Sequence, residues 1–334
     1  MSLRIAFAGT GSISKVHAQA AQNLGLELVA VVNHKVTSMI EFGKRFGITR
    51  QYENVETMLT AGNIDALVVS TPNYLHAPQT IAALDAGVHV MVEKPMALNA
   101  AQAERMREAS EKSSARLMVA HCWRFDLDVL WLKAQSAKLG RIIRTKSYGV
   151  HTHWGPSGWF TVKQFAGGGA MADMGIHALD TARFLLGDPK PVSVYAKIGT
   201  YYKEFDVDDT GVMIVEWENG ATSYIESGWW QPHSDGLEAA TQLYGQEGFG
   251  QLFPTCVEIR NTRDERIDLI ESGSEFPRKE HCPQSLYDDQ LKYFIECIEK
   301  KQTPIPGGLE GLMNIKVVDA AYESSTTGKV VEIK

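Results

Sequence analysis

The segment RIAFAGTGSIS, residues 4–14, decides the fold of the first part of the chain. A short apolar run ends at Gly9, and a glycine-containing turn then leads into a segment with helical spacing of apolar residues. Gly9 permits a tight turn, Gly11 lets the phosphates of a ligand approach the backbone, and Ser14 is small enough for close packing of helix on strand. Phosphate groups would then bind at the N-terminus of the helix. The order of strand, glycine turn and helix therefore predicts a nucleotide-binding βαβ unit.

Strand-like and helix-like patterns alternate over the first 120 residues. Short apolar runs separated by helical patterns predict βαβ units, with a parallel sheet covered by helices on both faces. The expected strands are residues 4–8, 28–32, 66–70, 89–92 and 116–120, and the expected helices are residues 14–23, 37–46, 75–86 and 99–111.

Length and composition limit the class of protein. A chain of 334 residues suits two domains, and contents of 44% hydrophobic and 22% charged residues are typical of a globular protein. The formal net charge of −7 argues against nucleic acid or an anionic membrane as a partner, because both require a basic surface. No apolar run approaches the roughly 18 residues of a membrane span. The four cysteines show no C-x-x-C spacing, which favours a reduced, cytoplasmic setting.

The second expected strand ends in VVNHK, residues 31–35, where a dinucleotide-binding fold commonly has an acidic residue for the ribose. Asn33 takes that place, and it lacks the negative charge that would repel a 2′-phosphate. His34 and Lys35 can contact such a phosphate. The pattern favours NADP(H) over NAD(H), while asparagine can also bond a ribose 2′-hydroxyl. An ordinary solvated loop is the alternative.

Polar residues also follow two later strands, in STPNYLH at 70–76 and in EKP at 93–95. Ligands of a doubly wound sheet bind beyond the carboxyl ends of its strands, so we expect these side chains to face the same crevice as the glycine turn. Elsewhere, a lysine such as Lys94 is most often a solvated surface residue. The residues expected to contact the cofactor are Gly9, Gly11, Ser12, Ile13, Asn33, His34, Lys35, Thr71, Asn73, His76, Glu93 and Lys94.

The segment GGGAMADMGIHALD, residues 167–180, places Asp173, His177 and Asp180 at positions i, i+4 and i+7 after three glycines. In a helix these side chains lie on one stripe, and the glycines let the backbone approach a cleft closely. We expect His177 to act as acid and base, because an imidazole exchanges protons near neutrality. Asp173 is expected to bond a substrate hydroxyl or orient the imidazole, and Asp180 to have a structural role. A histidine buried beside carboxylates for structural reasons alone is the alternative.

The chain changes character after HCWRF, residues 121–125. A helical pattern at 127–137 leads into strand-like runs that dominate from 141 to about 269. We predict a dinucleotide-binding domain at 1–122 and a domain for substrate binding and oligomerisation at 123–334. The last expected elements are helices at 286–299 and 309–324 and a short strand at 329–333.

Aromatic and histidine side chains crowd the segment that follows this boundary. Tryptophan faces pack well against the C–H faces of sugars, so a sugar site is one interpretation and core at a domain interface is the other. His151 and His153 share one face of a strand, but no third ligand is identifiable and no metal is expected. The aromatic residues are Trp123, Trp154, Trp159 and Phe160, and the residues expected to contact the substrate are Arg124, His151, Trp159, Asp173 and His177.

The motifs GxGxxS, TPN-x-x-H, EKP and GGG…D-x-G-x-H-x-x-D, in this order, resemble the glucose–fructose oxidoreductase/inositol dehydrogenase (Gfo/Idh/MocA) family essentially from end to end. The resemblance implies an α/β protein, with an N-terminal Rossmann doubly wound parallel sheet and a C-terminal α/β domain with a large, mostly antiparallel open sheet. In this family the exposed face of that sheet commonly forms dimer or tetramer contacts. The resemblance also implies that Lys94 lies beside the nicotinamide, before a cis Pro95, with Asp173 and His177 across the substrate from that ring.

These observations predict an NAD(P)-dependent oxidoreductase that transfers hydride reversibly between nicotinamide and a sugar, polyol or related hydroxyl or carbonyl compound. Lys94, Asp173 and His177 are the expected catalytic residues, with the lysine charge stabilising a developing alkoxide. The expected partners are a small-molecule substrate and further copies in a homodimer or homotetramer, with neither nucleic acid nor membrane. Two alternatives stay open: a reductase of a dihydrodiol, an imine or a tetrapyrrole, and a regulator that binds nicotinamide without turnover. The chain departs from the family pattern at Ser14, which should be harmless, and at Asn33, which leaves the choice between NAD and NADP open.

Overall fold

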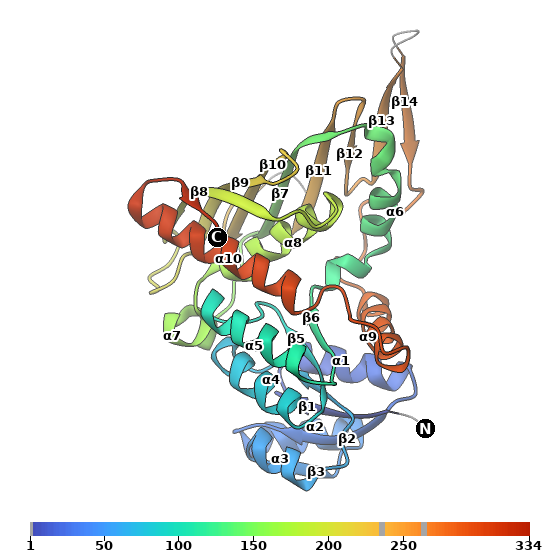
Figure 1. The fold of residues 1–334 in the computed structure, drawn as a ribbon, viewed down its shortest axis with the longest axis vertical. Coiled ribbons are helices and arrows are strands. Elements are labelled where there is room, and N and C mark those ends of the chain that lie inside the picture. The colour runs from blue at the N-terminus through green and yellow to red at the C-terminus, as the bar shows by residue number, and fades with distance from the viewer. Residues whose placement is uncertain (1–2, 234–237, 262–265) are drawn as a thin grey trace. The chain divides into compact units, whose positions relative to one another are not determined.

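The computed structural model describes residues 3–233, 238–261 and 266–334, and Figure 1 shows the chain as a ribbon. Contacts divide the chain into two compact units, Met1–Cys122 with Pro283–Leu312 and Trp123–Cys282 with Met313–Lys334. The first break falls at the boundary predicted from the sequence, and the segment Pro283–Leu312 groups with the first unit. The functional assignment of residues 1–122 and 123–334 stays a prediction.

The first unit is built on a parallel sheet. Within its described residues six strands pair in the order β3–β2–β1–β4–β5–β6, which confirms the predicted doubly wound fold. The strand order reverses between β1 and β4, and in such sheets ligands bind outside the carboxyl ends of the strands at this point. The strands are β1 Arg4–Ala8, β2 Glu27–Val32, β3 Arg50–Tyr52, β4 Ala66–Val69, β5 His89–Glu93 and β6 Leu117–Ala120.

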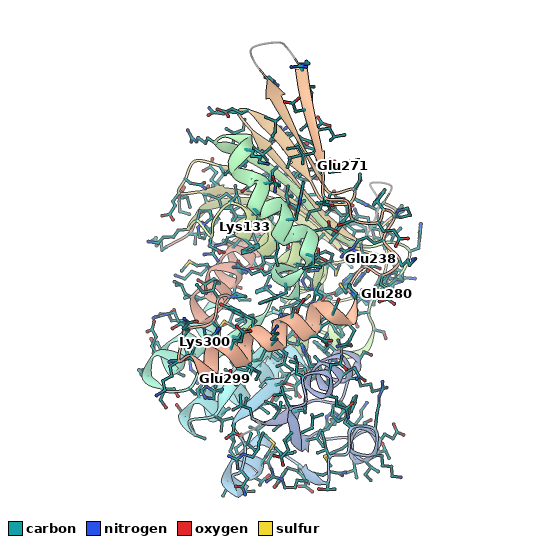
Figure 2. The ribbon with its side chains drawn as sticks, turned by 90° about the vertical axis from the view of Figure 1, so that its right-hand side faces the viewer. Lys133, Glu238, Glu271, Glu280, Glu299 and Lys300 are labelled. Carbon is teal, nitrogen blue, oxygen red and sulfur yellow. The ribbon has the colours of Figure 1, made fainter. Side chains whose placement is uncertain are left out.

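Helices connect these strands and cover the sheet. Helix α9 returns from the distant C-terminal part of the sequence and packs on α1, where Asn23 Nδ2 donates to Asp288 Oδ2 at 2.8 Å. Glu299 and Lys300, labelled in Figure 2, lie at the C-terminal end of α9. The helices are α1 Ser12–Asn23, α2 Val36–Phe46, α3 Val55–Ala61, α4 His76–Asp85, α5 Ala100–Lys112 and α9 Gln284–Glu299.

The second unit is built on a larger sheet. In the part of this unit that the structure describes, nine strands pair in the order β14–β13–β12–β11–β7–β10–β9–β8–β15. Only the β7–β10 pair is parallel among these strands, which confirms the mostly antiparallel sheet. The elements are α6 Leu127–Gln135, β7 Ile142–His151, α7 Lys163–Ala166, α8 Ile176–Leu185, β8 Pro191–Gly199, β9 Thr210–Trp217, β10 Thr222–Trp229, β11 Ala239–Gly245, β12 Gly248–Gln251, β13 Cys256–Asn261, β14 Arg266–Glu271 and β15 Val331–Glu332, together with α10 Gly308–Thr327 from Met313 onward.

Helix α8 and the π-helical turn before it, Met171–Gly175, lie against one face of β7 and β10. The approach is closest at Gly149, where an added Cβ would lie 2.3 Å from the Met174 carbonyl oxygen. Thr145 and Ser147 on the same face of β7 are fully buried. This glycine therefore lets the turn that carries Asp173 rest directly on the sheet. Among the described residues, no helix combines the length and the apolar character needed to cross a membrane.

Candidate functional site

The glycine turn after β1 meets the requirements of a phosphate-binding loop. Gly9 has φ +108°, and a Cβ there would lie 2.5 Å from the Ser70 carbonyl oxygen, so the fold itself requires glycine. Gly11 differs, because a Cβ added there would meet nothing within 4 Å. Gly11 is also the N-cap of α1, and no side chain among the described residues caps this helix end. Open space above uncapped N–H groups, including those of Ser12 and Ile13, suits the pyrophosphate of a dinucleotide.

Ser14 shows why serine is acceptable at the third position of the glycine motif. The residue is fully buried, and its Oγ lies 2.7 Å from Ser70 Oγ. Ser70 Oγ in turn donates to the Ala8 carbonyl oxygen at 3.2 Å, so Ser14 donates to Ser70. The hydroxyl thus joins α1 to the ends of β1 and β4, a role that a glycine could not fill.

The end of β2 is tied to the glycine turn through Asn33. Its amide Nδ2 donates to Thr10 Oγ1, and its Oδ1 accepts the backbone N–H of Lys35 at 3.3 Å. His34 and Lys35 are both exposed next to this amide. The amide nitrogen is therefore part of the loop structure, and an aspartate in its place would lose this donor.

The end of β4 carries three of the predicted cofactor residues. Thr71 is half-buried, and its Oγ1 donates to Gln79 Oε1 at 2.8 Å, while Asn73 is buried. His76 is only 1% exposed, with Nδ1 2.8 Å from the Pro95 oxygen and Nε2 2.9 Å from the Thr71 oxygen. Burial lowers the pKa of His76. Since both ring nitrogens already meet protein carbonyls, we leave His76 out of the proposed cofactor contacts.

Glu93, at the end of β5, is buried behind Lys94. Its Oε1 lies 2.6 Å from Nε2 of His17, and its Oε2 accepts the backbone N–H of Lys94 at 3.1 Å. We therefore assign Glu93 to holding this loop and leave it out of the cofactor contacts. The Lys94–Pro95 peptide bond is cis, as the resemblance implies, and the Lys94 side chain is half-buried. Sequence reasoning missed His17, although its spacing with Ser14 placed a histidine on the buried face of a helix.

Asp173 lies on the π-helical turn of the second unit. Its Oδ2 accepts the indole N–H of Trp229 at 3.0 Å. Trp229 is fully buried in a cluster with Ala170, Met174 and Val207. The indole therefore fixes the orientation of this carboxylate, and the π turn replaces the regular α-helical stripe expected for this segment. Sequence reasoning missed Trp229, because only the pairing of β10 with β7 brings it beside the turn.

Two of the three glycines before this turn, Gly168 and Gly169, make a close contact that differs from the predicted approach to a cleft. A Cβ on Gly168 would lie 2.1 Å from the Tyr322 hydroxyl, and a Cβ on Gly169 would lie 1.8 Å from the Asp208 carbonyl oxygen. The Asp208 carboxylate accepts the N–H groups of Gly169 at 2.8 Å and Met171 at 2.7 Å. The glycines thus let Asp208 and Tyr322 cap the start of the helix that carries Asp173 and His177.

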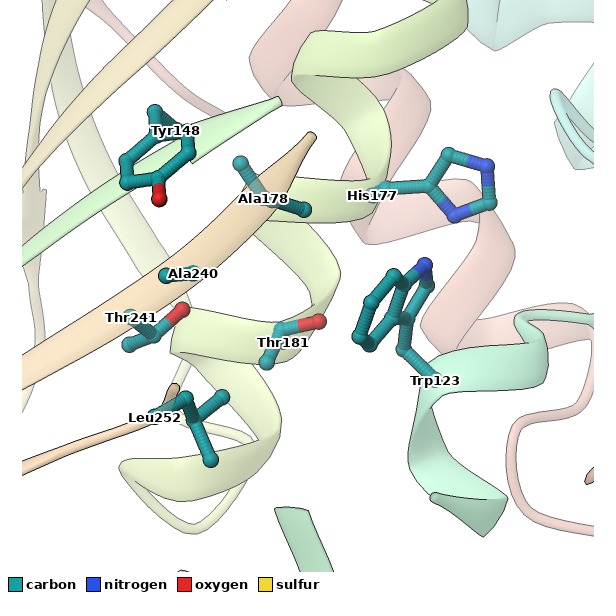
Figure 3. A pocket seen from close by; sticks show the side chains of 9 residues that line it. Trp123, Tyr148, His177, Ala178, Thr181, Ala240, Thr241 and Leu252 are labelled. Atoms are coloured by element: carbon teal, nitrogen blue, oxygen red, sulfur yellow. The ribbon is translucent and has the colours of Figure 1, made fainter. Parts of the chain in front are cut away.

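His177 lies on α8 and lines a small pocket in the second unit, shown in Figure 3. The indole of Trp123 forms one wall of this pocket, and Tyr148, Thr181 and Thr241 contribute hydroxyl-bearing side chains. Its free volume is about 10 Å³, room for roughly one water molecule, and its lining combines an aromatic wall, three hydroxyls and one imidazole. The lining residues are Trp123, Tyr148, His177, Ala178, Thr181, Ala239, Ala240, Thr241 and Leu252.

Arg124, predicted to contact the substrate, is instead held in a buried ion-pair network. It is 3% exposed, its Nε and Nη2 donate to Asp180 at 2.8 and 2.7 Å, and its Nη1 and Nη2 donate to Asp188 at 3.0 and 2.7 Å. Burial opposes the charge, but the two carboxylates raise the pKa of Arg124. Asn314 Nδ2 also donates to Asp180 at 2.8 Å. The geometry supports the structural role predicted for Asp180, and we leave Arg124 out of the proposed substrate site.

Replacing Asp180 with asparagine is expected to lower the free energy of unfolding by about 2–3 kcal/mol and the melting temperature by roughly 5–10 °C, with kcat nearly unchanged. The substitution removes the buried carboxylate and leaves Arg124 with Asp188 alone. Asp188→Asn is the matched control. It should lower the free energy of unfolding by less, because the Asp188 side chain is 25% exposed whereas that of Asp180 is 2% exposed. Thermal melting and kcat of the three proteins check this. A large loss of kcat at unchanged melting temperature would contradict the structural role.

The remaining predicted substrate residues lie outside this pocket's lining. His151 stacks on Trp154 at 3.7 Å between ring centroids, and its Nδ1 is 3.5 Å from Oε1 of Glu238, which Figure 2 labels. Trp159 is half-buried and stacks on Phe160 at 3.9 Å. Within residues 3–233, 238–261 and 266–334, no group of three or more histidine, cysteine or acidic side chains is placed to hold a metal ion. Contact of His151 and Trp159 with a substrate stays a prediction.

Both parts of the chain match known families. Residues 3–121 match the family described as "Oxidoreductase family, NAD-binding Rossmann fold", and residues 133–249 match the "GFO/IDH/MocA C-terminal domain". D-glucoside 3-dehydrogenase of Escherichia coli K12 is 30% identical over 99% of this chain and 97% of that protein. D-xylose 1-dehydrogenase (NADP(+)) 2 of Haloferax volcanii is 27% identical over 98% of this chain and 97% of that protein.

Among solved structures, levoglucosan dehydrogenase in complex with NADH and L-sorbose has a TM-score of 0.90 at 22% identity, covering 100% of both chains. This likeness shows the shared fold. With both parts of the chain matched and a relative similar along its whole length, the protein belongs to the Gfo/Idh/MocA family of oxidoreductases.

Proposed function

We propose that this protein is an NAD(P)-dependent dehydrogenase that acts on a CH–OH group of a sugar or polyol. The observation that carries the proposal is the position of His177 in a pocket with an aromatic wall and hydroxyl side chains. The open space at Gly11 above an uncapped helix end fits a dinucleotide in the other unit. The named sugar dehydrogenases among its relatives support the same chemistry.

Each proposed catalytic residue has a distinct task. His177 accepts the proton of the substrate hydroxyl during oxidation and returns it during reduction. Lys94 stabilises the developing alkoxide through its positive charge. Asp173, oriented by Trp229, bonds a substrate hydroxyl or orients the imidazole. When bound, the nicotinamide would accept the hydride that leaves the carbon bearing the reacting hydroxyl.

The absorbance of reduced cofactor at 340 nm tests this proposal. Purified protein is incubated with NAD⁺ or NADP⁺ and a panel of glycosides, aldoses and inositols, with dihydrodiols as a separate arm. Reduction with at least one sugar or polyol is the expected result. Turnover with dihydrodiols alone would favour the non-sugar alternative, and tight cofactor binding without any turnover would favour the regulator.

We propose a modest preference for NADP(H), which the substitution Asn33→Asp should reverse. The aspartate loses the amide donor and repels a 2′-phosphate, while its carboxylate accepts bonds from the ribose hydroxyls. The exposed Lys35 offers the phosphate a flexible point charge without the fork of an arginine, so discrimination by the natural protein should be a few-fold. The measurement is kcat/KM with both cofactors for the natural protein and the variant.

Asn54→Asp is the matched control for this substitution. Asn54 caps α3 through a bond from the Thr57 N–H, and aspartate caps helices equally well, so cofactor preference should stay unchanged. A natural protein that favours NAD⁺ tenfold or more would show that Asn33 serves the ribose hydroxyls.

We also propose that the protein works in the cytoplasm as a homodimer or homotetramer, joined through the sheet face opposite α8. On this face Tyr195, Ile214 and Tyr224 are neighbours in register, and Tyr195 and Ile214 are 37% and 44% exposed. A subunit partner would bury these side chains. Light scattering at micromolar concentration is expected to give two or four times the chain mass of 36.9 kDa. A measured mass equal to that of a single chain would contradict the proposal. The substitution Ile214→Lys should weaken the assembly, because it places a charge on this sheet face.

A further inference from the structure

A buried pair, His17 and Glu93, lies directly behind the segment that carries Lys94. His17 on α1 is fully buried, Glu93 at the end of β5 is 8% exposed, and Nε2 and Oε1 are 2.6 Å apart. Burying two ionisable groups is costly unless each is well bonded. None of the steps proposed above uses this pair, so its presence calls for a separate explanation.

The second carboxylate oxygen of Glu93 connects the pair to the lysine. Oε2 accepts the backbone N–H of Lys94 at 3.1 Å. His17 thus holds Glu93 with one bond, and Glu93 holds the first peptide group of the lysine with another. The carboxylate has one fixed position as long as both bonds persist.

His76 anchors the opposite end of the same segment. Its Nδ1 lies 2.8 Å from the Pro95 carbonyl oxygen, and its Nε2 lies 2.9 Å from the Thr71 carbonyl oxygen. A buried side chain thus holds the peptide group before Lys94, and the His76 ring lies against the carbonyl oxygen of the residue after it. Such support from neighbouring side chains is what a precisely placed charged group requires.

The carboxyl group of this pair also lies next to Lys94 in the chain. Nδ1 of His17 is buried with no hydrogen-bond partner among the described residues, so the hydrogen bond of this ring is the one between Nε2 and Glu93. Burial opposes ionisation of Glu93, yet the hydrogen bond and electrostatic attraction of His17, followed by the charge of Lys94, hold the pKa of this carboxyl below its usual value. Because such coupling is reciprocal, ionised Glu93 favours the protonated form of Lys94.

We propose that His17 and Glu93 are positioning residues for Lys94, which fix its backbone and keep its ammonium group charged through one buried carboxylate. The role assigned to Lys94 rests on the proposed function. The link from His17 through Glu93 to Lys94 is a property of the folded protein, and it can be measured without any substrate.

The first test measures the protonation of Lys94 directly. The rate of acetylation of Lys94 by acetic anhydride is followed by peptide mass spectrometry as a function of pH. Glu93→Gln should lower the pH midpoint of labelling by about one unit, because the lysine loses an anionic neighbour. His17→Leu should lower the midpoint by part of that amount, because Glu93 loses the bond that fixes its carboxylate. Glu93→Gln keeps the acceptor for the Lys94 N–H, so it removes the negative charge while leaving this hydrogen bond in place. This variant therefore tests the proposal even if His17→Leu fails to fold.

Two further variants separate positioning from general damage to the fold. His17→Gln retains a donor near the position of Nε2, so it should restore the labelling midpoint. His89→Gln changes a histidine at the other end of β5, where Nδ1 accepts the Arg116 N–H at 2.9 Å, and it should leave the midpoint unchanged. Midpoints within about 0.2 units of the natural protein in both His17→Leu and Glu93→Gln would overturn the inference.

The second test uses kinetics with saturating cofactor and substrate. His17→Leu should lower kcat about tenfold or more while the dissociation constant for NAD(P)H stays within about twofold, and His17→Gln should recover most of kcat. Equal losses in both variants, in step with their melting temperatures, would reduce His17 to a structural residue and overturn the proposal. If the natural protein oxidises no sugar, the proposed function fails, and the labelling experiment still decides the link between His17, Glu93 and Lys94.

Discussion

Replacing Lys94 with alanine is expected to lower kcat by about 10²–10⁴-fold, because a positioned charge that stabilises the developing alkoxide is lost. The loss should appear in kcat and in kcat/KM together, since the contact is made mainly in the transition state. Cofactor affinity should change little, because the glycine turn and the start of α1 remain intact. The measurements are steady-state kinetics and titration of NAD(P)H fluorescence.

Lys112→Ala is the matched control for this variant. Lys112 ends α5 and pairs at 3.4 Å with Glu108 on an exposed helix face, where such pairs contribute little. Its kcat should equal that of the natural protein. Near-natural turnover in Lys94→Ala would remove the lysine from the catalytic residues and with it the purpose proposed for His17 and Glu93.

Replacing His177 with alanine should cost a similar factor of about 10²–10⁴ in kcat, because the group that exchanges the hydroxyl proton is lost. The pH dependence of kcat should lose the limb that reports the imidazole. The side chain lines a pocket wall beside Trp123, so its removal leaves room for a small molecule. Added imidazole should therefore restore part of the activity in His177→Ala and leave Lys94→Ala unchanged.

Rescue by imidazole is the more informative measurement, because it distinguishes loss of the proton acceptor from damage to the pocket. A variant that turns over at the natural rate would show that His177 is a structural histidine. A large loss without rescue and with a lower melting temperature would point in the same direction.

The fold could be predicted where local patterns carry it. The eleven residues RIAFAGTGSIS predict a strand, a turn and the start of a helix, and the structure has β1, the glycine turn and the start of α1 there. The strand Arg50–Tyr52 and the helix Val55–Ala61 were missed, because elements of three and seven residues are too short to show a period. The placement of Pro283–Leu312 with the first unit depends on packing between distant parts of the chain, which no local pattern records.

The candidate site could be predicted only at the level of its motifs. Lys94, Asp173 and His177 follow from short patterns, whereas their supports come from other elements: Trp229 from β10 holds Asp173, and His17 from α1 holds Glu93. Charged residues were the hardest to assign. Arg124 beside an aromatic cluster suggested a substrate contact, and only tertiary structure brings Asp180 and Asp188 to its guanidinium.

Transfer of deuterium tests the central claim most directly. A sugar or polyol that supports reduction at 340 nm is supplied with deuterium on the carbon that bears the reacting hydroxyl, and the reduced cofactor is examined by mass spectrometry and NMR. The account predicts one deuterium per molecule at C4 of the dihydronicotinamide, on a single face of the ring, with none exchanged into water. Reduced cofactor without the label, or no reduction with any member of the panel, would contradict it.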